Sequence, residues 1–234
     1  MTRVTSDGNT NYAACWPGRQ QVTYNNFDAI YRINSTGTDE PVHILRSGVN
    51  TGPYGWSPDG NVLMYETSDS VSGTDIKFHI TNEKKEDYVL MPDKGNQMLA
   101  SFSPDGKYIA YTSDVSGQSG VYVQPFPPDG NRWVIFSDGG EEPKWSPNDR
   151  ILYYRYNQDW FQITFSTENE FSVIDRKKLF TGPYLNVPGY SYDITPDGQY
   201  FVLLKPVSSA QTSTKLKIIK NWLEEIKVLA PPKI

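Results

Sequence analysis

The side chains that could carry out catalysis are few in this chain, and their spacing forms no recognised catalytic motif. The only two histidines, His43 and His79, each stand inside a strand-like run. Residues 55–59 begin like a nucleophile elbow, in which a strained Gly-x-Ser-x-Gly turn exposes the serine, but Asp59 replaces the last glycine. A catalytic triad would need the fold to bring a serine, a histidine and a carboxylate together. The sequence therefore predicts no catalytic residue.

Residues that could bind a metal or a phosphate group are also sparse. Cys15 is the only cysteine, which excludes an internal disulfide and a cysteine metal cluster, and no His-Glu-x-x-His string occurs. Asp69, Asp75 and Asp114 lie in predicted loops and could bind Ca²⁺, but they lack the EF-hand spacing, and loop carboxylates are usually solvated. No phosphate-binding loop sequence is present. We expect no metal and no other cofactor.

Charge and hydropathy exclude two classes of partner. The formal net charge is -5, and no basic stripe is visible, so we expect no nucleic-acid partner. No segment approaches the roughly 20 apolar residues that span a bilayer, so we expect no membrane span. The first residues lack the apolar stretch of a signal peptide, as in a cytoplasmic protein or in a chain without its leader or anchor.

A repeated turn sequence organises the chain. It reads Trp-Ser-Pro-Asp-Gly at 56–60, Phe-Ser-Pro-Asp-Gly at 102–106, Trp-Ser-Pro-Asn-Asp at 145–149, Ile-Thr-Pro-Asp-Gly at 194–198 and, degenerately, Trp-Pro-Gly at 16–18. The prolines at positions 17, 58, 104, 147 and 196 are therefore 41, 46, 43 and 49 residues apart. A period of about 40–50 residues is typical of the four-stranded blades of a propeller.

The residues between these turns have the pattern of short strands. Predicted strands follow the turns at 21–24, 62–65, 108–111, 151–154 and 200–203. A polar loop and a third strand come next, as at 76–80 and 121–123, and then an outer strand, as at 133–136. Each unit is thus predicted to be a four-stranded antiparallel meander, which buries both faces only within a ring. The sequence predicts one all-β domain over residues 1–234, a β-propeller with units at about 9–50, 51–97, 98–140, 141–189 and 190–220.

The two ends of the chain indicate how the ring closes. The last unit lacks an outer strand, and residues 1–8 resemble the end of one, so we expect five blades closed by residues 1–8. The alternative is that these residues belong to a six-bladed ring. A closed ring predicts a monomer. Near the C-terminus, a capping Asn221 and a face formed by Trp222, Ile226 and Leu229 predict a short helix over residues 221–229.

A binding surface is expected where loops enter the first strand of each blade, around one mouth of the central channel. The side chains on these approaches are Tyr54, Met98, Glu141, Glu142, Tyr190 and Tyr192, and the polar–aromatic loop 155–160 adds Tyr156 and Trp160. Exposed aromatic rings beside carboxylates suit a protein loop, a peptide or a small polar ligand such as a sugar. The alternative is that the tyrosines pack between blades and that Trp160 begins a buried strand.

Two sets of residues resemble known families. Residues 102–113, Phe-Ser-Pro-Asp-Gly-Lys-Tyr-Ile-Ala-Tyr-Thr-Ser, resemble the repeat of TolB-like β-propellers. Residues 121–127, 138–146 and 221–226 are similar to the sensor-like propeller C-terminal to membrane-anchored bacterial serine/threonine kinases. The resemblance covers essentially the whole chain and implies a periplasmic or extracytoplasmic location. Family members commonly have six blades and an upstream domain, whereas this sequence has at most five units and no kinase motif.

The sequence thus favours a non-catalytic module that binds a protein, a peptide or a small polar ligand, with a sensor role in bacterial signalling implied by the resemblance. One alternative is an enzyme, such as a glycan lyase or a hydrolase, with its active site in the channel. That hypothesis requires His43 or His79 to face the channel beside carboxylates or a metal. A further alternative is a structural fragment of a larger propeller protein.

Overall fold

The computed structural model describes residues 13–16, 20–71, 73–81, 87–90, 95–148, 150–206 and 217–218, with only the backbone described at 13–16 and 217–218. Within this part of the chain every regular element is a β-strand. It contains no helix that is long and apolar enough to cross a membrane. Residues 1–8 and 221–229, for which a closing strand and a helix are predicted, lie outside the described residues.

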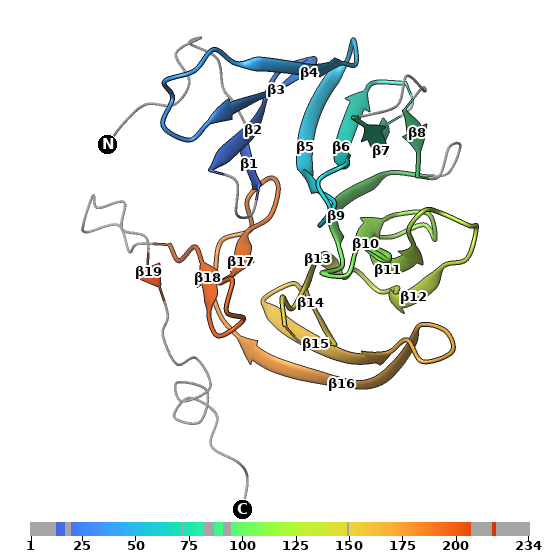
Figure 1. Ribbon diagram of the computed structural model, residues 1–234. Coiled ribbons are helices and arrows are strands. Elements are labelled where there is room, and N and C mark those ends of the chain that lie inside the picture. The colour runs from blue at the N-terminus through green and yellow to red at the C-terminus, as the bar shows by residue number, and fades with distance from the viewer. Residues whose placement is uncertain are drawn as a thin grey trace, which may run out of the picture.

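The strands form five antiparallel sheets arranged around a common centre (Figure 1). The first sheet contains β1 (Ala13–Trp16), β2 (Gln21–Asn26), β3 (Ala29–Asn34) and β4 (Val42–Arg46). The second contains β5 (Asn50–Trp56), β6 (Val62–Asp69), β7 (Gly73–Ile80) and β8 (Tyr88–Val89). The third contains β9 (Gln97–Phe102), β10 (Tyr108–Ser113), β11 (Gly120–Pro125) and β12 (Trp133–Phe136).

The fourth sheet contains β13 (Glu141–Trp145), β14 (Ile151–Tyr156), β15 (Asp159–Ser166) and β16 (Ser172–Thr181). The fifth contains β17 (Tyr192–Ile194), β18 (Phe201–Leu203) and β19 (Lys217–Ile218), three strands among the described residues. Strand order follows the chain in every sheet, and the first strand of each lies nearest the centre (Figure 1). The prediction of an all-β propeller built from antiparallel meanders is confirmed.

The repeated turn is held by its own side chains. The Ser57 hydroxyl donates to Asp59 Oδ1 over 2.6 Å and accepts the Val62 N–H over 2.9 Å. The Gly60 N–H donates a hydrogen bond to the Ser57 carbonyl and so closes the turn. Gly60 has a φ of 74°, which glycine adopts without strain. Equivalent hydrogen bonds occur in the turns that begin at Ser103 and Thr195. The serine or threonine of the repeat is therefore part of the turn.

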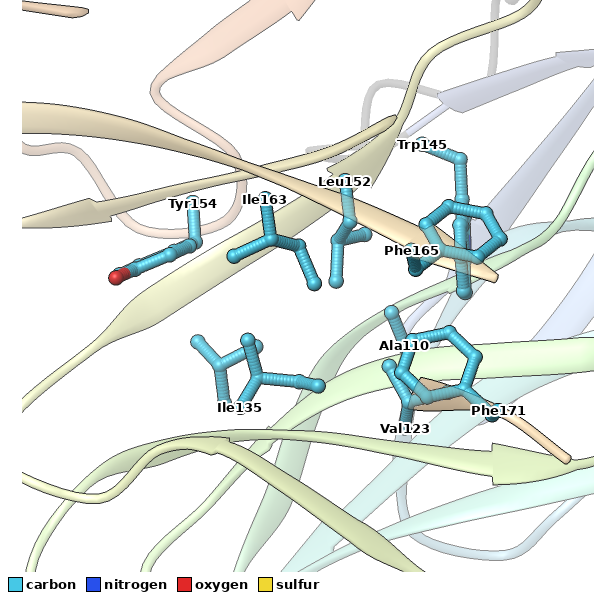
Figure 2. Packing of buried hydrophobic residues seen from close by; sticks show 10 residues of the cluster. Ala110, Val123, Ile135, Trp145, Leu152, Tyr154, Ile163, Phe165 and Phe171 are labelled. Atoms are coloured by element: carbon cyan, nitrogen blue, oxygen red, sulfur yellow. The ribbon is translucent and has the colours of Figure 1, made fainter. Parts of the chain in front are cut away.

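The apolar core lies between neighbouring sheets. In Figure 2, Ala110, Val123 and Ile135 of the third sheet face Leu152 and Ile163 of the fourth. Similar clusters fill the spaces between the second and third sheets, the fourth and fifth, and the first and second. Burial of apolar area stabilises by about 25 cal/mol per Å². Because each core needs two sheets, neighbouring sheets depend on one another.

Indole hydrogen bonds add to this packing. Trp56 Nε1 donates to Thr23 Oγ1 of the first sheet over 2.7 Å. In the same way, Trp145 Nε1 donates to the Ser101 carbonyl of the third sheet over 3.0 Å. The tryptophan that opens a repeat thus links its own sheet to the preceding one.

The innermost strands are interrupted by bulges. The register shifts between Pro53 and Gly55 in β5 and between Glu141 and Lys144 in β13, and a third shift lies where β9 pairs with β10. Leu99 and Glu142 stand at these sites with φ of 53° and 57°. A bulge re-aims the residue it contains. The freed Leu99 N–H reaches the Tyr54 hydroxyl over 2.7 Å, in the preceding sheet.

Candidate functional site

A cavity of about 450 Å³ lies at the end of the innermost strands where the repeated turns begin. We call it the central cavity. It is lined by the first residue of four repeats, Trp56, Phe102, Trp145 and Ile194, and by their prolines, Pro58, Pro104, Pro147 and Pro196. The same two positions of each repeat therefore build the wall from four different sheets. The repeat therefore shapes this cavity as well as the fold.

An ion pair supplies polar groups to this apolar wall. Lys144 Nζ contacts Asp193 Oδ1 at 2.8 Å, and both residues line the central cavity. The same ammonium group lies over the Tyr190 ring, 4.3 Å from its centroid. The Lys144 side chain is 22% exposed and the Asp193 side chain 69%, so the pair adds little stability and remains accessible to a ligand.

Tyr54 connects the cavity wall to a buried hydrogen-bond chain. Its hydroxyl donates to Glu66 Oε2 and accepts the Leu99 N–H. Burial raises the pKa of the Glu66 carboxyl, although the hydrogen bond from Tyr54 acts in the opposite direction. Burial also raises the pKa of Tyr54 well above its usual value. The phenol is therefore neutral, and its position is fixed from both sides.

Glu142 forms a buried cluster at the opposite end of β13. Its carboxylate accepts the Ser191 N–H over 2.6 Å and pairs with Arg155 Nη1 at 3.2 Å. Arg155 Nη1 also donates to Ser191 Oγ over 2.7 Å. Burial raises the pKa of Glu142, while the hydrogen bonds from Ser191 and the charge of Arg155 lower it. Because these groups satisfy one another, the cluster holds the fourth and fifth sheets together and offers little to a ligand.

The other residues predicted for the binding surface are buried or partly buried, and three of them form hydrogen bonds within the protein. Tyr192 is buried and donates its hydroxyl hydrogen to the Glu142 carbonyl, and the Tyr190 hydroxyl donates to the Pro143 carbonyl. Glu141 Oε1 accepts a hydrogen bond from Asn186 Nδ2 over 3.2 Å. Met98 is partly buried in β9, and Tyr156 is partly buried with its ring 5.3 Å from that of Phe136.

Trp160 is fully buried in β15, beneath the Arg155 guanidinium. Of the eight residues predicted, only Tyr54 lines the central cavity. The structure brings Glu142, Tyr190 and Tyr192 together between sheets rather than on an open surface. The cavity residues missed by the sequence reasoning had a clear signal, because they are the first and third positions of the repeat.

Neither histidine lines the central cavity. His43 lies on β4, the outermost strand of its sheet, against the edge of the Tyr31 ring. His79 lies on β7, where Nδ1 is 2.7 Å from Asp87 Oδ1. The arrangement that the enzyme hypothesis requires, with a histidine facing the channel, is thus not found at either position. In the described part of the chain, no group of three or more His, Cys, Asp or Glu side chains could hold a metal ion.

Comparison with solved structures identifies the type of fold. No family model matches the chain, and a search of curated proteins finds no match. Solved structures do match. TolB from Acinetobacter baumannii superimposes with a TM-score of 0.66 and 22% identity, over 88% of this chain and 51% of that one. A TolB-type structure from Agrobacterium tumefaciens superimposes with a TM-score of 0.54 and 18% identity, over 69% of this chain and 63% of that one.

A chain of a nidogen/laminin complex gives a TM-score of 0.56 and 14% identity, over 79% of this chain and 67% of that one. The chain thus spans about half of the Acinetobacter TolB and 63% of the Agrobacterium structure. At these identities the likeness concerns the fold alone. The chain folds as a TolB-like β-propeller.

Proposed function

We propose that this propeller is a non-catalytic binding module whose central cavity holds an extended segment of a partner protein or a peptide. The observation that carries the proposal is the wall of the cavity, to which four sheets contribute the same two positions of the repeat. A volume of about 450 Å³ falls within the range of ligand sites in proteins. Aromatic side chains such as Trp56 and Trp145 are also the residues that protein interfaces favour.

The chemistry of the wall fits a peptide better than a strongly charged ligand. Apolar rings and prolines provide surface for side chains, while Lys144 and Asp193 provide one donor group and one acceptor group. An extended peptide carries both backbone N–H and C=O groups, which need partners of both kinds. The opposite charges of the pair cancel, so the site has no preference for an anion or a cation.

The biological setting proposed for this module is the sensor or interaction part of a bacterial signalling protein outside the cytoplasm. Its support is the resemblance of residues 121–127 and 138–146 to the propeller of membrane-anchored kinases. One of the similar solved structures is a nidogen/laminin complex, which is consistent with a role in protein recognition.

The proposal can be tested by selecting peptides from a displayed random library on the folded chain and measuring their affinity by calorimetry. Ser101 lines the cavity, so Ser101→Phe should fill it and abolish binding. Lys144→Ala should weaken binding roughly tenfold, as expected for the loss of a charged hydrogen-bond donor. The matched control is Lys178→Ala, because Lys178 forms a similar 2.8 Å surface pair with Asp159 on the outer strand β16.

Circular dichroism melts of the variants separate loss of the site from loss of the fold. If selected peptides bind Ser101→Phe and the native chain equally well while the variant stays folded, the central cavity is not the binding site. Turnover of the selected peptides by the native chain would overturn the non-catalytic assignment.

A further inference from the structure

A second cavity, of about 310 Å³, lies between the third and fourth sheets and shares no lining residue with the central cavity. We call it the rim cavity. Three segments far apart in the sequence form it. They are the turn before β10 with Lys107 and Tyr108, the loop before β12 with Asn131 and Trp133, and the loop before β16 with residues 169–171. Loops that converge on one cavity from two sheets are a common setting for a ligand site.

One wall of the rim cavity is aromatic and held in place by packing. The Trp133 ring lies 6.1 Å from that of Tyr108 and 5.3 Å from that of Phe171, centroid to centroid. Phe171 is 2% exposed and belongs to the core between the two sheets, whereas Trp133 and Tyr108 remain partly exposed. The cavity therefore presents a preorganised aromatic surface, which suits a ligand with an apolar face.

The remaining wall is polar and carries charges of both signs. Lys107, Asn169 and Glu170 are exposed side chains that line the cavity. Asn131 donates from its backbone and side-chain nitrogens to Asp129, at 2.9 and 3.1 Å, which fixes the loop that carries Trp133. Lys107 supplies a positive charge, and Asp129 and Glu170 supply negative ones. Arg132 also lines the cavity, but its guanidinium group lies over the Tyr122 ring, 5.0 Å from the centroid, on the side of the third sheet that faces the second.

We propose that the rim cavity binds a carbohydrate. A pyranose ring presents an apolar C–H face, which fits against Trp133 and Tyr108. Its hydroxyl groups both donate and accept, which suits a lining that includes an ammonium, an amide and a carboxylate. Charges of both signs in the lining suit a neutral polyhydroxylated ligand better than an ion of either sign. This site is independent of the peptide site proposed for the central cavity.

The test is saturation-transfer NMR and calorimetry on the full chain with neutral sugars: glucose, galactose, N-acetylglucosamine, maltose, cellobiose and chitobiose. We expect at least one to bind with a millimolar or tighter dissociation constant. Glu170→Gln should weaken that binding roughly tenfold. The matched control, Glu168→Gln, removes the same charge from an exposed position on the same loop that does not line the cavity, and should leave binding unchanged.

A second variant distinguishes loss of the binding site from unfolding of the protein. Lys107 is exposed, so Lys107→Ala should keep the melting temperature and weaken the same sugar, whereas peptide binding in the central cavity should be unaffected. The proposal is overturned if none of the six sugars binds. It is overturned equally if Glu170→Gln and Glu168→Gln have the same effect. Binding of free amino acids in place of sugars, with the same dependence on Glu170 and Lys107, would also overturn it.

Discussion

Glu142 and Arg155 are the only charged side chains that are buried in the described part of the chain. A buried charge that loses its partner costs about 3–5 kcal/mol. Arg155→Met removes the guanidinium group and leaves the Glu142 carboxylate with the hydrogen bonds from Ser191 alone. We expect the free energy of unfolding, measured with urea, to fall by about 3–5 kcal/mol. A loss below about 1 kcal/mol would show that the Glu142 carboxylate does not need the Arg155 charge in the folded state.

The same variant should change the pH dependence of stability. Burial raises the pKa of the Glu142 carboxyl from its usual 4.5, and loss of Arg155 raises it further. The folded state then holds a proton to higher pH than the unfolded chain, so stability is retained in acid and lost as the pH rises through the raised pKa. The cost of Arg155→Met should therefore be smaller at about pH 4 than at about pH 7. Adding Glu142→Gln to that variant should abolish the difference, because no carboxyl group remains to titrate.

The strands and turns could be predicted from the sequence, and the bulges could not. Predicted strand 133–136 coincides with β12, and predicted strands 62–65, 108–111 and 151–154 begin β6, β10 and β14. These elements follow from local turn chemistry and hydrophobic runs. The bulges at Leu99 and Glu142 depend on partners in the preceding sheet, Tyr54 and Thr112, which lie 45 and 30 residues earlier. No local pattern contains that information.

Three glycines allow the cost of a positive φ to be measured separately from the cost of crowding a Cβ atom. Gly106 and Gly117 lie outside the strands, and Gly55 lies in β5. Gly106 has a φ of 71°, and a Cβ there would lie 3.2 Å from Pro58 Cδ in the neighbouring turn. Gly117 has a φ of 94° with nothing within 4 Å, and Gly55 combines open space with an ordinary φ. We expect Gly106→Ala to cost most, Gly117→Ala about 1 kcal/mol and Gly55→Ala least, in urea unfolding. If Gly117→Ala costs no more than Gly55→Ala, the positive φ at Gly117 is not what requires a glycine there.

At the scale of the whole molecule, the binding surface predicted from the sequence and the central cavity share one residue, Tyr54. The loop aromatics were expected on an open surface, yet Tyr192 and Trp160 are buried. Spacing along the chain identifies which residues recur, but not which of them the neighbouring sheet covers. That depends on the packing of sheets, as in the hydrogen bond from the Tyr190 hydroxyl to Pro143.

Closure of the ring is the property on which the molecule as a whole depends. The fifth sheet has three strands among the described residues, and the other four sheets have four each. From the sequence we propose that residues 1–8, which lie outside the described residues, supply its outer strand beside β19. A ring completed by both ends of the chain would leave no sheet short of a strand and would be monomeric.

Deleting residues 1–8 should therefore lower the melting temperature by roughly 10 °C or more, because an outer strand contributes several kcal/mol in a domain of this size. It should also promote self-association, since the newly exposed edge of β19 can pair with another chain. Light scattering and a thermal melt on the full chain and on residues 9–234 measure both effects. Deleting residues 230–234 is the control for trimming a terminus, and it should change neither. If residues 9–234 melt like the full chain and stay monomeric, residues 1–8 are not part of the ring.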